Sequence, residues 1–288
     1  MSRPGGLTTS ALPPPAPDAP APGRHAGAHV DRLRARLVDI GRVTVAFSGG
    51  ADSAFLAWVA QDTLGAEAVH AVTAVSASLA ESEAADCAAL AREWGLRWTP
   101  VVTDELARTE YAVNGADRCY HCKAELLDVV GPLAAADGST VVLGVNVDDL
   151  GDHRPGQVAA AERGACFPLV DAGFTKADVR AWSRRLGLRT WDKPAAACLA
   201  SRVPYGSPVT VAVLDSVGRA EAGLKALGFR QVRVRHHGTV ARVEVDGSEL
   251  ERAVARRADI VAAVKAAGYH YVALDLEGFR SGSLNEIL

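Results

Sequence analysis

The stretch V-T-V-A-F-S-G-G-A-D-S, residues 43–53, combines the signals of a strand, a glycine turn and the start of a helix. Every second residue from Val43 to Phe47 is β-branched or aromatic, which is the pattern of a short strand. A helix-compatible segment, residues 54–64, follows directly after the turn. The stretch therefore predicts a strand–turn–helix unit.

The turn carries groups that suit a phosphate ligand. Gly49 and Gly50 let the backbone approach a ligand without a Cβ in the way, and the first N–H groups of the helix attract anions. Ser48 and Ser53 add hydroxyl donors, and Asp52 supplies a carboxylate that suits Mg²⁺. The alternative is an ordinary turn in which Ser and Asp cap the helix. The pattern favours nucleotide binding over this alternative.

The turn differs from the two best-known glycine-rich phosphate loops. It lacks the lysine of a Walker loop, G-x-x-x-x-G-K-[ST], and the third glycine of the Rossmann fingerprint. It resembles the PP-loop, S-G-G-x-D-S, of the ATP pyrophosphatase superfamily. This resemblance implies an adenine nucleotide alpha hydrolase-like parallel sheet, cleavage of ATP to AMP and pyrophosphate, and adenylation of a substrate oxygen.

Composition narrows the class of protein. The chain has 288 residues, 49% of them hydrophobic, and a net charge of −3. The near-neutral charge argues against nucleic acid as a partner, and no apolar run reaches the roughly 18 residues of a membrane span. The five cysteines are an odd number, and two of them form a C-x-x-C. We therefore expect a soluble cytoplasmic protein in which cysteine serves metal or redox chemistry, not disulfides.

Strand and helix patterns alternate over residues 28–204, which predicts an α/β domain whose parallel sheet is covered on both faces. The expected strands are residues 43–47, 68–75, 97–102 and 140–146, and the expected helices are 29–40, 54–64, 81–94, 120–136, 157–163 and 175–187. In such a sheet the ligand lies beyond the carboxyl ends of the strands, where residues 48–53 and 144–149 would meet.

Two further segments flank this domain. Residues 1–27 are rich in Pro, Ala and Gly, which predicts a disordered tail. Residues 205–288 predict a small α+β domain for substrate binding or oligomerisation, with an antiparallel sheet and a boundary at P-Y-G-S-P, residues 204–208. Its expected elements are helices 209–227 and 248–267 and strands 231–235, 240–245 and 269–276.

Three cysteines are candidate ligands. Cys119 and Cys122 form the C-x-x-C at the start of a predicted helix, where the helix N-terminus is expected to lower the pKa of both thiols. A single C-x-x-C is only half a zinc site, and passive packing is the alternative. Cys198 adds a third thiol, and three thiolates suit a 4Fe-4S cluster with one open iron. Cys87 and Cys166 are expected to be small core residues.

Several long motifs in the same order make the chain similar to the LarE-type ATP-dependent sulfur transferases. They are S-G-G-A-D-S, R-C-Y-H-C-K, G-V-N-V-D-D-L-G-D-H-R-P-G, K-P-A-A-A-C-L-A-S-R-V-P-Y-G and Y-V-A-L-D-L-E-G-F-R-S-G-S, and the match runs from about residue 30 to the C-terminus. This family adenylates a carboxylate of pyridinium-3,5-biscarboxylic acid mononucleotide and replaces it with a thiocarboxylate. The product leads to the nickel-pincer nucleotide cofactor of lactate racemase.

Two sulfur sources occur in this family. Some members sacrifice the sulfur of one cysteine at the position of Cys198, and others hold a 4Fe-4S cluster that delivers a bound sulfide. Because Cys119, Cys122 and Cys198 are all present, the chain resembles the cluster type. The resemblance also implies a sulfide donor or cysteine desulfurase as a partner, and a homo-oligomer, often a hexamer.

The resemblance further implies roles for individual residues. Asp52 and Cys198 are the candidate catalytic residues, with ATP and Mg²⁺ bound at the PP-loop. Further candidate contacts of ATP or Mg²⁺ are Asp148, Asp149, Asp152 and Arg154, for which a solvated turn is the alternative. The candidate substrate contacts are Ser201, Arg202, Glu221, Arg233 and Arg235.

The alternation of charged residues with valines gives a second interpretation of the arginines. Arg233 and Arg235 alternate with valines, as do Arg242 and Glu244, which predicts the exposed face of a half-buried sheet. The substrate, with its phosphate and two carboxylates, favours arginines as anion contacts instead.

Two other functions compete with sulfur transfer. One is a different adenylating PP-loop enzyme, such as a tRNA thiolase or an amide-forming synthetase. A thiolase is disfavoured by the near-neutral charge and by the acidic D-D-L-G-D segment. The other is a non-catalytic nucleotide-binding module in which the C-x-x-C is structural.

Overall fold

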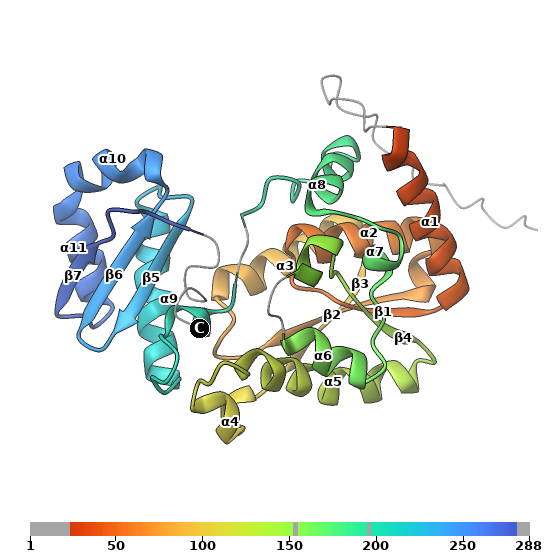
Figure 1. Cartoon of the computed structure of the whole chain (residues 1–288), viewed down its shortest axis with the longest axis horizontal. Coiled ribbons are helices and arrows are strands. Elements are labelled where there is room, and N and C mark those ends of the chain that lie inside the picture. The colour runs from red at the N-terminus through yellow and green to blue at the C-terminus, as the bar shows by residue number, and fades with distance from the viewer. Residues whose placement is uncertain (1–23, 152–154, 195–196, 281–288) are drawn as a thin grey trace, which may run out of the picture.

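The computed structural model describes residues 24–151, 155–194 and 197–280, which form two sheets with their covering helices (Figure 1). The predicted tail, residues 1–27, lies outside the described residues except for 24–27. These four belong to helix α1 (Arg24–Ile40), which therefore begins earlier than the sequence predicts.

The first sheet has four parallel strands in the order β3-β2-β1-β4. They are β1 (Val43–Ala46), β2 (Val69–Val75), β3 (Arg97–Val102) and β4 (Thr140–Leu143). Strand β1 lies between β2 and β4, with Val43 opposite both Val69 and Thr140. The predicted parallel α/β sheet is thus confirmed, and all four carboxyl ends meet at one edge.

Helices cover both faces of this sheet. On one face, α1, α2 (Ala51–Leu64), α3 (Glu81–Trp94), α7 (Pro168–Asp171) and α8 (Lys176–Arg185) contribute to one apolar core. On the other face, α5 (Arg118–Ala136) and α6 (Pro155–Glu162) pack against β4 (Figure 1). Short connections complete this part, namely η1 (Ala66–Ala68), η2 (Glu105–Ala107), α4 (Thr109–Ala112) and η3 (Val147–Gly151). Helix α8 begins with a capping box between Thr175 and Asp178.

The C-terminal part is built on a three-stranded sheet in the order β5-β6-β7. Its elements are α9 (Val211–Ala226), β5 (Val232–His237), β6 (Val240–Val245), η5 (Gly247–Glu249), α10 (Leu250–Ala255), α11 (Arg257–Ala266) and β7 (Tyr271–Leu274). The predicted hairpin is present, with Gly238 at a φ of +62°.

Two details of the C-terminal prediction are wrong. The sheet is mixed, because β6 and β7 run parallel. The helical crossover between them returns the chain to the starting end of β6, whereas an antiparallel pair needs only a tight turn. The expected helix at 248–267 is divided into η5, α10 and α11, with a break at Arg256 (φ −97°, ψ 20°).

The predicted boundary at residues 204–208 lies beside a core that both parts share. Tyr111 of α4 packs there with Leu199, Val203 and Leu214, which follow it by many residues in the chain. The division into domains 28–204 and 205–288 stays a prediction.

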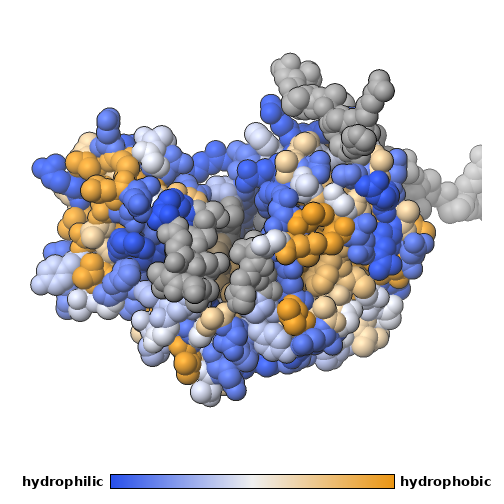
Figure 2. All heavy atoms as spheres, in the orientation of Figure 1, coloured by the Kyte–Doolittle hydropathy of each residue, from blue (hydrophilic) through white to orange (hydrophobic). Residues whose placement is uncertain are grey.

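On the face that Figure 2 shows, hydrophilic residues predominate, and hydrophobic residues form separate patches among them. Among the described helices, none combines the length and apolar character needed to cross a membrane.

Candidate functional site

The loop between β1 and α2 is a tight turn closed by its own hydroxyl groups. The Oγ atoms of Ser48 and Ser53 lie 3.0 Å apart, and Ser53 Oγ donates to the carbonyl of Gly50 at 3.2 Å. Gly49 has a φ of +66°, and a Cβ there would lie 2.9 Å from Cys87 Sγ. Glycine is therefore required at position 49 for both backbone conformation and space.

The end of β4 approaches the first turn of α2 backbone to backbone. A Cβ on Gly144 would lie 2.7 Å from Ser53 N and 2.8 Å from Asp52 C. This contact places the residues after β4 beside the PP-loop. The sequence predicted that residues 144–149 would meet the loop, but it did not identify Gly144 as the contact.

The Asp52 carboxylate is held from two sides. Its Oδ1 accepts a hydrogen bond from Asn146 Nδ2 at 3.3 Å, and its Oδ2 forms an ion pair with Lys176 Nζ. Lys176 is the first residue of α8, and the sequence pattern alone did not connect it with the PP-loop. The Asp52 carboxylate is therefore paired with the ammonium group of Lys176 in this structure.

The acidic residues after β4 organise the backbone in this structure. Asp148 accepts from the Lys176 N–H at 2.8 Å, and Asp149 accepts from the Asn146 N–H at 3.1 Å. The first bond joins the segment after β4 to the start of α8, and the second stabilises the turn within that segment. Asp152 and Arg154 lie outside the described residues, and the role of all four residues toward ATP or Mg²⁺ stays a prediction.

A second lysine reaches the PP-loop from a distant segment. Lys193 Nζ donates to the carbonyl of Gly49 at 3.1 Å and pairs with Asp86 at 2.6 Å and Glu83 at 2.8 Å. Burial alone would lower the pKa of Lys193, but the two carboxylates outweigh it and raise the pKa above its ordinary value. A lysine ammonium group held by two carboxylates therefore contacts the loop.

One cavity of about 300 Å³ joins the PP-loop to two of the candidate cysteines. Ser48, Gly50, Asp52 and Ser53 line it on one side, and Cys122 and Cys198 line it as well. Its further polar and charged lining residues are Thr73, Ser76, Ser78, Thr103, Glu105 and Lys123. Phosphate-binding groups and thiols distant in the chain thus face the same space.

The three candidate cysteines interact but do not form a ready metal site. Burial first, and the nearby Cys198 second, raise the pKa of the Cys122 thiol to about 12, whereas Cys119 is exposed. For Cys122 the expected lowering of the pKa at a helix N-terminus is wrong, because burial disfavours the thiolate more strongly. Within the described ranges, no three His, Cys, Asp or Glu side chains are arranged to hold a metal ion.

The cysteine segments are held together by buried polar side chains. Arg118 Nη1 donates to the carbonyl of Ala200 at 3.0 Å and also contacts Asn114 Oδ1. Asn114 Nδ2 donates in turn to the carbonyls of Pro204 and Ser207, both at 2.8 Å. The start of α5, which carries Cys119 and Cys122, is thereby fixed against the segment that follows Cys198.

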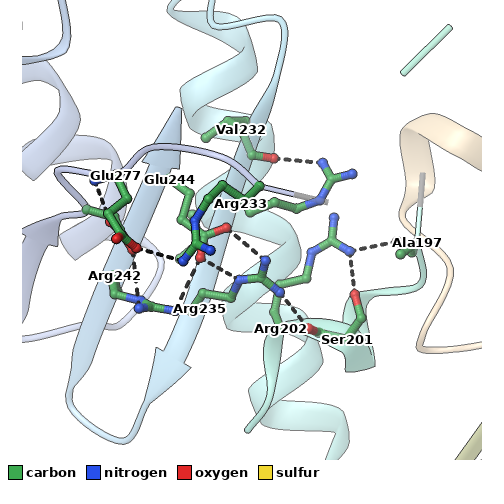
Figure 3. Close-up of polar contacts among 12 residues, drawn as sticks. Ala197, Ser201, Arg202, Val232, Arg233, Arg235, Arg242, Glu244 and Glu277 are labelled. Atoms are coloured by element: carbon green, nitrogen blue, oxygen red, sulfur yellow. Dashed lines mark hydrogen bonds and ion pairs between the residues drawn. The ribbon is translucent and has the colours of Figure 1, made fainter. Parts of the chain in front are cut away.

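The candidate substrate contacts form a buried charged cluster (Figure 3). Arg202 makes a bidentate pair with Glu221 at 2.7 and 2.9 Å, and Arg235 makes one with Glu244 at 2.9 and 2.8 Å. Arg233, beside them, has its pKa lowered to about 10, mainly by burial and then by the charge of Arg202.

Figure 3 shows why the predicted exposed face of β5 and β6 is wrong. The 3-10 turn η4 (Leu199–Arg202) lies against this face, and Arg235 Nη1 donates to the Ser201 carbonyl at 2.9 Å. Glu244, expected to face outward, is only 1% exposed. Arg202 Nη1 also donates to the Cys198 carbonyl at 3.0 Å, so the cluster adjoins the candidate sulfur residue.

Comparison with known proteins gives this arrangement a family. The NAD synthase family profile matches residues 29–116. The pyridinium-3,5-bisthiocarboxylic acid mononucleotide synthase of Lactiplantibacillus plantarum is 38% identical over 257 residues, which cover 89% of this chain and 93% of that protein. The chain belongs to the LarE-type ATP-dependent sulfur transferases. An uncharacterized Synechocystis protein is 45% identical over 90% of this chain and 97% of its own length. An uncharacterized protein of Methanocaldococcus jannaschii is 23% identical over 83% of this chain and 91% of its own length.

In this LarE-type chain, sequence reasoning missed three contacts at the PP-loop. Lys193 stands in one of the motifs that identify the family, and Gly144 directly follows β4, so both carried a signal. Lys176 carried none beyond its place at a helix start. All three depend on segments that only folding brings together.

Proposed function

We propose that this ATP-dependent sulfurtransferase adenylates a carboxylate of pyridinium-3,5-biscarboxylic acid mononucleotide and converts it to a thiocarboxylate. The product would be the sulfur-containing precursor of the nickel-pincer nucleotide cofactor of lactate racemase. The single observation that carries the proposal is the shared cavity, which has the PP-loop and Cys198 on its wall. The Lactiplantibacillus plantarum relative, whose name describes this synthesis, supports the choice of substrate.

The first step activates the carboxylate. A carboxylate oxygen of the substrate attacks the α-phosphorus of ATP, a P–O bond forms, and pyrophosphate leaves with the electrons of the broken bond. Free N–H groups at the start of α2, together with Lys193, would stabilise the departing negative charge. Asp52 would help to hold Mg²⁺, with Lys176 shifting from its carboxylate toward the phosphates.

The second step replaces AMP with sulfur. AMP is a good leaving group, so the acyl carbon is open to attack by a sulfur nucleophile, and the C–O bond to AMP breaks as the C–S bond forms. Cys198 lies on the wall of the cavity that the PP-loop also lines, which supports attack by a sulfur atom from this side. The other two cysteines, Cys119 and Cys122, lie at the start of α5, which follows α4 in the chain.

For the sulfur source, we propose a 4Fe-4S cluster held by Cys119, Cys122 and Cys198. Cys122 and Cys198 line the same cavity, and Cys119 precedes Cys122 by three residues in the first turn of α5, which supports a common ligand. Binding of the metal would drive deprotonation of the thiols. When bound, the cluster would supply a replaceable sulfide at its open iron. Sacrifice of the Cys198 sulfur is the alternative, and it needs no rearrangement of the three thiols. In that case Cys198 Sγ would form a thioester as AMP leaves, and loss of the Cα proton with cleavage of the Cβ–Sγ bond would release the thiocarboxylate and leave dehydroalanine at position 198.

For the substrate itself, we propose that its phosphate and carboxylates bind at the arginine cluster. The contacts would be Ser201, Arg202, Glu221, Arg233 and Arg235. Burial favours this role because a desolvated guanidinium binds an anion more strongly than an exposed one does. A sulfide donor or cysteine desulfurase, assembly as a homo-oligomer such as a hexamer, and a cytoplasmic location belong to the same proposal.

The test combines product and metal analysis on anaerobically purified protein. We expect pyrophosphate and a thiocarboxylate when ATP and the dicarboxylate nucleotide are mixed, together with about four iron and four or five sulfide per chain. Loss of one sulfur from Cys198 per turnover in iron-free protein, measured by mass spectrometry, would replace the cluster with the sacrificial source. ATP binding without pyrophosphate release would support the non-catalytic module instead.

A further inference from the structure

A buried carboxylate on the cavity wall has no part in the chemistry described so far. Glu105 is the first residue of η2, directly after the segment that ends β3, and it is 3% exposed. It lines the same cavity as Cys122, Cys198 and the PP-loop. The groups that contact Glu105 therefore indicate whether it stabilises the fold or binds a ligand.

Three hydroxyl groups hold the carboxylate in place. Ser76 Oγ donates to Glu105 Oε1 at 2.6 Å, and Ser78 Oγ donates to the same oxygen. Thr103 Oγ1 lies 3.3 Å from Oε2, which makes the weaker contact. The serines follow β2 and the threonine follows β3, so the carboxyl ends of two strands orient one acidic group.

No lysine, arginine or histidine among the described residues forms an ion pair with this carboxylate. Lys123 lines the same cavity but forms no such pair with Glu105. Hydroxyl groups are neutral donors, and a buried carboxylate without an opposite charge is costly. The other two glutamates that are as deeply buried, Glu221 and Glu244, each have a bidentate arginine. Within the part of the chain that the structure describes, Glu105 therefore differs from both in having no ion-pair partner.

We propose that Glu105 supplies the counter-charge for the cationic pyridinium ring of the substrate. This inference rests on the proposed function, because it takes its ligand from that reaction. The ring nitrogen of the substrate carries a permanent positive charge, whereas its other charged groups are anionic. The carboxylate undergoing reaction has to lie between the PP-loop and Cys198, which brings the ring into the cavity that Glu105 lines.

The site has a cationic region and an anionic group, just as the substrate has anionic groups and a cationic ring. The arginine cluster suits the phosphate and carboxylates, and Glu105 suits the ring. Asp52, the other carboxylate on the cavity wall, is paired with Lys176 and belongs to the ATP side. Glu105 is thus a specificity-determining residue that selects an oxidised, cationic ring over a neutral one.

The test compares two ligands that differ in ring charge. They are the pyridinium dicarboxylate mononucleotide and its neutral 1,4-dihydropyridine form, each titrated calorimetrically into full-length protein saturated with α,β-methylene ATP. We expect the wild-type chain to prefer the pyridinium form by roughly 30-fold or more, and Glu105→Gln to lose most of this preference by binding the pyridinium form more weakly. Its affinity for the ATP analogue should stay unchanged.

Glu110→Gln is the matched control, because Glu110 is exposed and lies only five residues further along the chain. It removes the same charge and should leave the preference intact. Equal binding of both ring forms by the wild-type chain would overturn the proposal without any variant, so a folding defect in Glu105→Gln cannot leave it undecided. A loss of ATP-analogue affinity in Glu105→Gln, with the ring preference kept, would assign the carboxylate to the nucleotide and also overturn it. Absence of binding of either ring form by the wild type would instead refute the proposed function.

Discussion

Replacement of Gly144 by alanine tests whether the backbone contact between β4 and the PP-loop helix is as tight as the structure indicates. The new Cβ would lie 2.7 Å from Ser53 N, 2.8 Å from Asp52 C and 2.9 Å from Ser53 Cα. These are backbone atoms, so no side chain can rotate away, and β4 or α2 must shift. Overpacking of this kind costs about 1–3 kcal/mol. At about 2–4 °C per kcal/mol, we expect a clear fall in the melting temperature.

The matched control is Gly131→Ala, which places the same methyl group in the interior of α5. No atom lies within 4 Å of a Cβ at this position, and alanine is the better helix former by about 0.5–1 kcal/mol. Calorimetric melting should therefore show a lower stability for Gly144→Ala and a higher stability for Gly131→Ala than for the wild type. Because the shift occurs at the PP-loop, ATP affinity should also fall in Gly144→Ala alone. Wild-type melting and wild-type ATP affinity in Gly144→Ala would refute the reasoning.

Three further predictions concern charged and titrating groups. Asp52→Asn should abolish pyrophosphate release while leaving iron content and melting temperature near wild type; loss of iron as well would make Asp52 structural. Glu221→Gln should lower the free energy of unfolding by roughly 3 kcal/mol in a denaturant titration, because it leaves the buried Arg202 without its charge partner. The control Asp215→Asn breaks an exposed ion pair on the same helix and should lower it by less than about 0.5 kcal/mol. In iron-free protein, burial raises the pKa of Cys122 from its ordinary value of 9.0 to about 12, so the thiol should react slowly with iodoacetamide at pH 7.5. Its contribution to the free energy of unfolding should be complete below pH 9 and should be lost as the pH rises toward 12. Rapid alkylation of Cys122 at pH 7.5, located by mass spectrometry, would contradict this.

The charge pairs at the PP-loop have a consequence for ATP binding. Lys176 and Lys193 both contact carboxylates in this structure, and Asp52 is one of them. In the proposed reaction, ATP phosphates bound at the PP-loop would compete for the same lysines. Part of the electrostatic gain from ATP is therefore offset by the ion pairs that it displaces.

Local sequence patterns were sufficient for the parallel sheet and the PP-loop. Alternating apolar residues, two glycines and a capping box act over a few positions, so the strand ending at Ala46 and the helix beginning at Lys176 are readable without any tertiary contact. The order of strands and helices then determines which edge of the sheet carries the loops. The same local reasoning failed for β7, because the direction of a strand depends on where its crossover returns the chain.

Burial was decided only by the tertiary structure. The valine–arginine alternation of β5 correctly predicts two different faces, but the turn η4 covers the arginine face and turns a wet surface into a buried ionic cluster. The pKa of the Cys122 thiol is likewise determined by burial and not by the helix N-terminus. Glu105 showed no pattern in the sequence, since its three hydroxyl partners come from the ends of two strands. A sequence records which groups a chain carries and in what local order, whereas desolvation and pairing depend on segments far apart in that order, and folding alone brings these together.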